Sequence, residues 1–382
     1  MSNDPASTAF QLDAEDALTA ATRAVETEVV AVMVDRLASL SPEDSLADAL
    51  SNAPADLMRI ERALERGADG VSAAAEAVMD EMALANEEWG APMFEAAGVA
   101  YSAESVAAIV AAGKADAVDA VRLRMSTSVI GLATQDGVLP IREAYTAIVS
   151  RAAADMVIGA ASGQNAVSYA VSEALGHLCG NGVRVMYASG ATRDLTAAVR
   201  QSVMGAYRRT MHDARWEMGR QFGADGVEVS AHGLCAPDHL PYQGRQMSLK
   251  AYEAVNASLD RPIMDGANCH HLAFPVLLGV SPPAYSEAEL DELVETSQRE
   301  VTVTGLSGKP LTMTRYEATQ YQRRLETMMR KERMRAAMEE RAGLDPAESK
   351  ARVRALQSRY RAVSNEAELV TRGELTRVRI PS

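Results

Sequence analysis

The hydrophobic periodicity of this chain changes along its length, and this change limits the folds that it can adopt. Much of the sequence has apolar residues at three- and four-residue spacing, which is typical of amphipathic helices bounded by Gly, Pro or Asn clusters. This pattern predicts helices over residues 71–86, 103–125, 140–158, 166–179 and 194–222. Between residues 226 and 283 the pattern stops, and six of the fourteen prolines lie there. We therefore expect long helices joined to one small, loop-rich module.

Shorter signals complete the outline. A helical stretch after Asp44 and Ser45 is expected to end at Gly67, and a short strand is expected over 183–187. Beyond the module, a helix begins after residue 285, and a β-hairpin follows with Ser307 and Gly308 in its turn. A long charged helix over 315–342 and a last helix starting at residue 345 or 346 complete the chain.

These patterns predict a predominantly α-helical α+β fold. Aromatic residues make up only 4% of the chain and methionines number 19, which favours helices packed through small and flexible side chains. We expect four regions, an acidic helical one over 1–125, a helical one over 126–225, the His/Cys module over 226–285, and a hairpin with basic helices over 286–382. The first residues lack the pattern of a signal peptide and no apolar run is long enough for a membrane span, so we expect a cytoplasmic product without membrane contact.

Charge is unevenly distributed along the chain, whose net charge is −14. Residues 1–100 hold 20 Asp and Glu against 5 Lys and Arg, whereas residues 315–361 hold 13 Lys and Arg against 7 Asp and Glu. Two interpretations remain open: both ends are solvated helix faces, or each end binds a different partner. The basic residues with which the long helix of 315–342 could contact DNA or a partner protein are Arg323, Arg324, Arg330, Lys331, Arg333 and Arg335.

The module contains most of the metal-binding side chains of the chain. Four of the six histidines and two of the three cysteines fall in "AHGLCAPDHLPYQG" and "NCHHLAFP". Imidazole and thiolate groups are the ligands of zinc, and a small irregular module gains stability from a metal. The spacing favours His232, His239, Cys269 and His271 as four ligands of a structural zinc, with Cys235 and His270 as alternates. The competing interpretation is that the histidines bind backbone groups and that Cys269 is simply buried.

At these residues the chain resembles the phage minor capsid protein 2 family. Its pattern runs S-x-H, R-P-x-H, W-Q-G and then G-x-N-C-x-H, against "SAH", "APDH", "YQG" and "GANCHH" here. The similarity extends upstream to Tyr187 and downstream through "YEATQYQRRLETMMRKER" to Lys331. The chain departs from the family pattern where Leu234 replaces Gly, Ala236 replaces Arg and Tyr242 replaces Trp.

The resemblance implies a minor head protein of a tailed phage or prophage. Such a protein is made in the cytoplasm of the bacterial host, resides in the head of the virion, and acts at the portal vertex in head assembly or in DNA packaging and ejection. Its expected partners are the portal protein and other head proteins, with non-specific contact to packaged DNA. Within the motif, Gln243 and Asn268 are expected to orient loop backbone through their amides, and Gly244 to allow a tight turn.

Two other classes of function compete with this one. A His/Cys zinc site with an open position could activate water for hydrolysis, and a phage head could carry such an effector. The sequence has no H-E-x-x-H, G-x-S-x-G or P-loop motif, so we expect no enzyme. A free DNA-binding regulator is disfavoured by the net acidity and by the absence of a recognisable readout motif.

Overall fold

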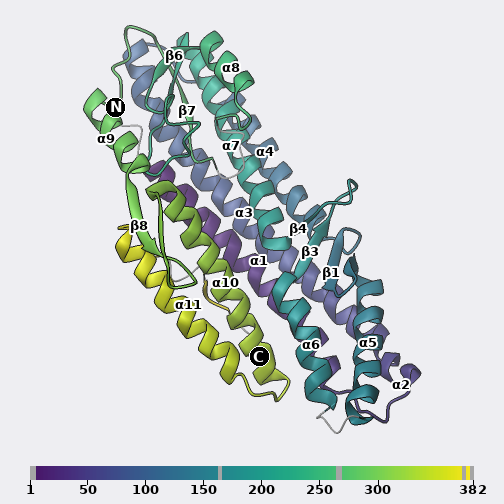
Figure 1. The fold of residues 1–382 in the computed structure, drawn as a ribbon. Coiled ribbons are helices and arrows are strands. Elements are labelled where there is room, and N and C mark those ends of the chain that lie inside the picture. The colour runs from purple at the N-terminus through teal and green to yellow at the C-terminus, as the bar shows by residue number, and fades with distance from the viewer. Residues whose placement is uncertain (1–5, 162–165, 264–268, 372–375, 379–382) are drawn as a thin grey trace.

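The structure is a computed structural model and describes residues 6–161, 166–263, 269–371 and 376–378 (Figure 1). It is predominantly helical with small sheets, which confirms the predicted fold class. The helices are α1 (Ala6–Ala38), α2 (Leu46–Leu50), α3 (Ala53–Ala97), α4 (Ala103–Arg124), α5 (Ile141–Ala161), α6 (Ala166–Asn181), α7 (Leu195–Phe222), α8 (Leu249–Ser258), α9 (Glu287–Gln298), α10 (Arg315–Arg341) and α11 (Ala347–Glu366). The strands are β1 (Ile130–Thr134), β2 (Gly137–Pro140), β3 (Val183–Met186), β4 (Thr192–Asp194), β5 (Gly226–Val229), β6 (Gln246–Ser248), β7 (Ala273–Val276), β8 (Glu300–Thr304) and β9 (Pro310–Thr314).

Most helix boundaries follow local sequence signals. Ser286 caps α9, and its side chain and that of Glu289 satisfy each other's backbone N–H in a capping box. Thr314 and Glu317 do the same at the start of α10. The hairpin of β8 and β9 turns through Gly308, whose φ is 81°. These elements match their predictions because the residues that fix them are close in sequence.

The predicted helix end at Gly67 is wrong. Helix α3 continues through Gly67 and runs for 45 residues, from Ala53 to Ala97. A Cβ atom at Gly67 would lie 2.9 Å from Val25 Cγ1 of α1 and closer still to Cγ2. The glycine therefore allows α1 and α3 to approach each other closely. It was predicted to end a helix because glycine commonly does so, whereas here its role is in packing.

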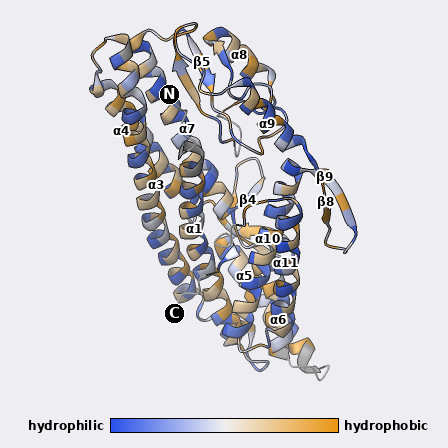
Figure 2. Ribbon diagram, turned by 90° about the vertical axis from the view of Figure 1, so that its left-hand side faces the viewer, coloured by the Kyte–Doolittle hydropathy of each residue, from blue (hydrophilic) through white to orange (hydrophobic). Residues whose placement is uncertain are grey.

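Helix α1 lies inside the bundle and carries much of the core. It packs against α3, α6 and α7, and α4 packs against both α3 and α7 (Figure 2). One hydrophobic cluster extends from Ala14 of α1 to Met338 of α10 and includes buried residues from β1, β3, β5 and β7. Residues from all four regions expected from the sequence thus contribute to a common core.

The loop-rich segment lies at one end of the bundle and contains a small sheet with strand order β6-β5-β7 (Figure 1). Arg215 of α7 lies beneath it, with its guanidinium 4.0 Å from the ring centroid of Phe274 in β7. The same guanidinium donates to Asn86 Oδ1 of α3 over 2.8 Å. Because Arg215 is buried, this contact ties the sheet to the two long helices.

A second sheet, of order β2-β1-β3-β4, lies along the side of the bundle. Its strand β3 confirms the strand predicted over 183–187, whereas the pattern did not predict the β1–β2 hairpin. The C-terminal helices α10 and α11 pack together and, with β8, enclose a separate cluster that includes Val303, Leu325 and Tyr360. Among the described residues, no helix has an apolar stretch long enough to cross a membrane.

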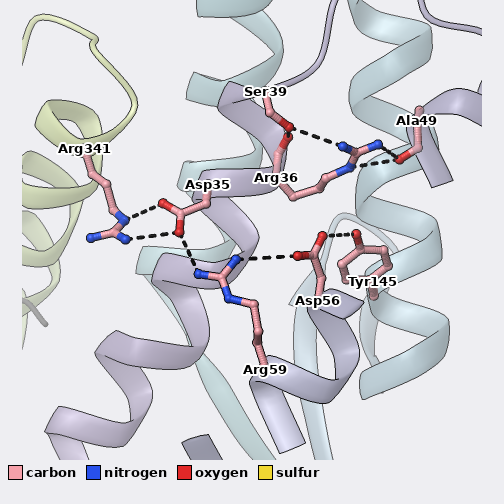
Figure 3. A network of polar contacts seen from close by, with 8 residues as sticks. All are labelled: Asp35, Arg36, Ser39, Ala49, Asp56, Arg59, Tyr145 and Arg341. Carbon is pink, nitrogen blue, oxygen red and sulfur yellow. Dashed lines mark hydrogen bonds and ion pairs between the residues drawn. The ribbon is translucent and has the colours of Figure 1, made fainter. Parts of the chain in front are cut away.

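The acidic start and the basic end of the chain contact each other. Figure 3 shows Asp35 of α1 between Arg341 of α10 and Arg59 of α3. Arg59 also approaches Asp56 at 3.6 Å, and Asp56 accepts a hydrogen bond of 2.7 Å from Tyr145 of α5. These contacts join four helices at the end of the bundle opposite the small β5–β7 sheet.

Candidate metal centre

The pairing of β5 with β7 brings the two His/Cys stretches together. The strands are antiparallel, and Val229 lies opposite Ala273. One residue further, Ser230 N–H donates to Leu272 C=O over 2.8 Å and Ser230 Oγ accepts from Leu272 N–H over 2.8 Å. In this register the residues that follow β5 face those that precede β7, so His232 comes to lie beside His271.

A compact turn returns the chain from His232 to β6. Its backbone bonds include His239 N–H to Ala236 C=O and Gln243 N–H to His239 C=O. Gly244 ends the turn with φ of 68°, and an added Cβ would lie 3.1 Å from Leu290 Cδ1 and closer still to Cδ2. The glycine is thus required both by its backbone conformation and by close packing, in line with the turn expected there.

The first group of candidate ligands comprises His239, Cys269 and His271, all of them buried. Cys269 Sγ lies 3.6 Å from His239 Nδ1 and 3.4 Å from His271 Nδ1. Sulfur and nitrogen ligands of a tetrahedral zinc are separated by about 3.6 Å, given bonds of roughly 2.3 Å and 2.1 Å. The two distances from Cys269 Sγ therefore match those of a zinc site.

A backbone carbonyl orients the His239 ring for this role. His239 Nε2 lies 2.7 Å from the carbonyl oxygen of Arg261, so Nε2 carries the proton and donates it. The lone pair of the neutral ring is then on Nδ1, the nitrogen that faces Cys269. An outer hydrogen bond of this kind fixes the tautomer of histidine ligands in metal sites.

A second group of candidate ligands comprises His232, Cys235 and His271. Cys235 Sγ lies 3.4 Å from His271 Nε2. His232 Nδ1 lies 3.1 Å from the carbonyl oxygen of Gly233, which leaves the lone pair of its neutral ring on Nε2. That Nε2 is buried and has no hydrogen-bond partner among the described residues, so its lone pair is available to a metal.

His271 is shared by the two groups through opposite ring nitrogens. It presents Nδ1 to Cys269 and Nε2 to Cys235. A neutral imidazole has one lone pair, so it can bind metal in only one of the two groups at a time. Three of the four expected ligands, His239, Cys269 and His271, are thus together, whereas His232 lies in the other group with the alternate Cys235.

Burial opposes charge on His271 and on Cys235 at this centre. Burial, with the nearby His232 and His239, holds the pKa of His271 well below its usual range. Burial and the neighbouring Cys269 raise the pKa of the Cys235 thiol well above its usual range. A bound cation would favour the thiolate and the neutral imidazoles, which are the forms that coordinate metals.

His270, the other alternate, lies outside both groups. Its Nε2 approaches Glu15 Oε1 of α1 at 3.3 Å, and its carbonyl oxygen accepts a hydrogen bond of 3.0 Å from Gln11. The motif residue Gln243 is buried at the centre, where its Oε1 lies 3.4 Å from His271 Nε2 and accepts from His232 N–H over 3.2 Å. Asn268 falls outside the described residues.

The basic residues singled out on α10 differ in exposure. Arg323 and Arg324 are exposed, whereas the other four are half-buried. Arg330 approaches Asp194 at 3.8 Å, Arg333 donates to the carbonyl oxygen of Thr376 over 2.7 Å, and Arg335 pairs with Glu339 at 2.9 Å. All three contacts lie within the protein, and the one between Arg330 and Asp194 joins α10 to the start of α7.

Sequence reasoning missed the residues that support the centre from a distance. Arg261 contributes a backbone carbonyl, which no side-chain pattern can reveal. Glu15 and Gln11 lie more than two hundred residues before the motif, and only the fold brings them to His270. Leu234 has φ of 58°, a left-handed conformation that favours glycine, at the position where the family pattern has Gly.

Comparison with known proteins gives one clear match. Neither the curated proteins nor the solved structures contain a significant match to the chain. The family model described as phage minor capsid protein 2 matches residues 15–364 of the 382 in the chain, which include all but the start of α1, both groups of candidate ligands and most of α11. This match covers nearly the whole sequence and confirms the resemblance found at the His/Cys motif. The chain belongs to the phage minor capsid protein 2 family.

Proposed function

We propose that this protein is a structural component of a phage head that acts at the portal vertex during head assembly, DNA packaging or DNA ejection. The observation that carries the proposal is the family match over residues 15–364. A minor capsid family supports a structural role in the phage particle and contact with other head proteins. An elongated bundle with a sheet module at one end also suits a docking component, because its two ends can touch different neighbours.

The module is proposed to be held together by one structural zinc. His239, Cys269 and His271 supply three ligand atoms at zinc spacing, and the carbonyl of Arg261 fixes the ring of His239. The fourth ligand is His232 or Cys235. Both lie in the second group, which shares His271 with the first. Rotation of the His271 ring, or a shift of the 232–235 turn, would bring the fourth ligand to the metal.

Zinc at this centre would act as a structural clamp. It would connect the 232–239 turn, which follows β5, with Cys269 and His271, which precede β7. The binding free energy of a metal in such a site contributes directly to folding, since the unfolded chain has no preformed site. Strands β5 and β7 share the main hydrophobic core, so a metal would add stability mainly to the turns that flank them.

A zinc-dependent hydrolase is the second candidate function. It is favoured only by the ligand count, because three ligands with an open fourth position are typical of catalytic zinc. The burial of His239, Cys269 and His271 opposes it, since a substrate must reach the metal. Coordination of a fourth protein ligand would leave no position for a reactive water.

Contact with the portal or with packaged DNA is proposed for the exposed face of α10. Arg323 and Arg324 carry this part of the proposal, because their side chains are exposed whereas the other four are half-buried. Contact with DNA would be non-specific and would weaken steeply with salt as counterions are released.

Cryo-electron microscopy of intact heads tests the proposed location. Heads with and without this protein, reconstructed without imposed symmetry, should differ by density at the portal vertex. Heads assembled with an Arg323→Ala/Arg324→Ala variant serve as the matched sample for the α10 contact. Difference density spread over the shell lattice, or no difference at all, would exclude the portal vertex as the site of action.

A further inference from the structure

Gln243 lies between the two groups of candidate ligands. Its side chain is buried, and its Oε1 is within hydrogen-bond distance of two nitrogens, the backbone nitrogen of His232 at 3.2 Å and His271 Nε2 at 3.4 Å. A backbone N–H can only donate, so the atom of the Gln243 amide that faces it must be the oxygen. The backbone of the turn that follows β5 therefore fixes the orientation of this amide.

The fixed oxygen determines which nitrogen of His271 carries the proton. Burial opposes a charged imidazolium, so the His271 ring has one N–H and one lone pair. An amide oxygen has no proton to give, so the contact of 3.4 Å is a hydrogen bond only if Nε2 donates. The lone pair of His271 is then on Nδ1, the nitrogen that faces Cys269.

Cys235 imposes the same choice on His271. Its thiol donates to the carbonyl oxygen of Ala236 over 3.3 Å, so its sulfur can only accept from His271 Nε2, which lies 3.4 Å away. The proton on Nε2 thus has two acceptors, an amide oxygen and a sulfur. In the protein without metal, both neighbours therefore favour the same tautomer of His271.

This tautomer directs two ring lone pairs at one sulfur. The carbonyl oxygen of Arg261 leaves the lone pair of His239 on Nδ1, 3.6 Å from Cys269 Sγ. His271 Nδ1 lies 3.4 Å from the same sulfur. The first group of candidate ligands thus has its lone pairs in place before a metal binds. The second group could use His271 only after the proton had left Nε2.

We infer that Gln243 is a positioning residue that selects the first group as the metal site by holding the proton of His271 on Nε2. The inference rests on the proposed structural zinc and adds that zinc binds His271 through Nδ1. Outer acceptors of this kind orient histidine ligands, and their loss commonly lowers metal affinity by about 10- to 100-fold. The fourth ligand, His232 or Cys235, must then reach a metal on the Nδ1 side of His271.

The test uses full-length protein labelled with ¹⁵N at histidine. Because the chain has only six histidines, long-range ¹⁵N–¹H NMR spectra can be assigned ring by ring, with His271→Gln identifying the ring of interest. The shifts of the two ring nitrogens report which one carries the proton. Spectra are recorded at about pH 7.5, above the ordinary histidine pKa, first without metal and then with zinc.

Three variants separate the role of the amide from a general effect on the module. Gln243→Leu removes the acceptor, and Gln243→Glu keeps an oxygen at the same place. Gln246→Leu is the matched control, since the amide of Gln246 donates to Glu228 and to the carbonyl oxygen of Ser281 instead. Zinc affinity of each protein is measured by competition with a chromophoric chelator.

Without metal, His271 should carry its proton on Nε2 in the wild type, in Gln243→Glu and in Gln246→Leu, whereas Gln243→Leu should populate both tautomers. With zinc, Nδ1 should show the shift of a metal-bound nitrogen, and Gln243→Leu should bind zinc about 10-fold or more weakly. A variant with the wild-type tautomer and affinity despite Gln243→Leu overturns the inference.

The wild-type spectra decide the matter even if Gln243→Leu does not fold. A proton on Nδ1 without metal, or zinc on Nε2, refutes the role of Gln243 although zinc binds. A wild type that keeps its proton on Nε2 but binds no zinc refutes the structural zinc, and the selected metal site with it. Failure of the inference and failure of the zinc proposal are thus distinguishable.

Discussion

Asp35 of α1 accepts hydrogen bonds from Arg341 of α10, 306 residues later in the chain, at 2.5 Å from Nε and 3.0 Å from Nη2 (Figure 3). Burial acts to raise the pKa of Asp35, but the hydrogen bonds from Arg341 and Arg59 outweigh it and lower that pKa. Stability from this carboxylate is therefore present above its unfolded pKa and is lost as the pH falls through the folded value.

A double-mutant cycle should measure this contact. Asp35→Asn, Arg341→Gln and the double variant are compared by chemical denaturation. We expect a coupling free energy of about 0.5–1 kcal/mol at pH 7, because both side chains are partly exposed and the pair is screened by solvent. The coupling should shrink in acid and in high salt. Additive effects of the two substitutions at pH 7 would mean that the ends of the chain are not joined here.

The proposed metal centre predicts the zinc content of the purified protein. Protein purified without chelators should contain close to one zinc per chain by elemental analysis. Cys269→Ser/His271→Ala should lose the metal and more than about 3 kcal/mol of stability, because metal binding to a closed site contributes to folding. Cys179→Ser is the control, since Cys179 is also buried but lies on α6. A fully folded protein without metal would remove the zinc proposal.

Cobalt substitution should identify the fourth ligand. The thiolate-to-Co²⁺ charge-transfer absorption reports how many cysteines bind, so one thiolate indicates His232 and two indicate Cys235. His232→Ala and Cys235→Ser are compared in the same assay, and only the true ligand should weaken metal affinity, by about 10-fold or more. If neither variant loses metal affinity, the fourth coordination position is open, which would favour the catalytic alternative.

The distances between α3 and its neighbours predict that replacing two of its glycines by alanine has opposite effects on stability. Gly67→Ala should destabilise the protein by about 1–3 kcal/mol, because the new methyl group would overlap Val25 of α1. Gly70→Ala should stabilise it by about 0.5–1 kcal/mol, since a Cβ there meets nothing within 4 Å and alanine is the better helix former. Val25→Ala should recover part of the loss in the Gly67 variant. Equal effects at the two positions in thermal unfolding would contradict the close approach of α1 and α3.

Glu26 of α1 should make the protein less stable as the pH rises towards 8. Its Oε1 accepts from Thr196 N–H and Oγ1–H, both at 3.0 Å, at the start of α7. Burial, and then the charge of Asp194, raise the pKa of Glu26 from 4.5 to about 7. A carboxyl group with a raised folded pKa contributes stability below its unfolded pKa, and this contribution is lost as the pH rises through about 7.

Glu26→Gln tests this dependence, because glutamine keeps an acceptor for Thr196 but does not ionise. The variant should be about 1–3 kcal/mol more stable than wild type at pH 8 and nearly equal to it at pH 5. Asp13→Asn, an exposed change on the same helix, controls for the removal of one negative charge. If the wild type is more stable than Glu26→Gln at pH 8, Glu26 is charged and stabilising in the folded protein.

The sequence predicted those features that depend on nearby residues. The boundaries of α7 and α10 and the turn at Gly308 follow from caps, periodicity and glycine placement. The end at Gly67 was mispredicted because its role depends on Val25, a contact between two helices. The convergence of His239, Cys269 and His271 was expected from residue type, but the division of the ligands depends on the β5–β7 register and on which nitrogen of His271 faces each sulfur. No pattern in the sequence encodes that orientation.

The uninterrupted course of α3 makes the protein a spacer of fixed length. Asp56 lies at the end of the bundle where Tyr145 and α5 are, and Trp89 packs on Phe274 of β7 at the other end. The 33 positions between residues 56 and 89 rise about 50 Å in an α-helix. A helix packed along its length against α1, α4 and α7 resists bending. Any neighbours bound at the two ends are therefore kept about 50 Å apart.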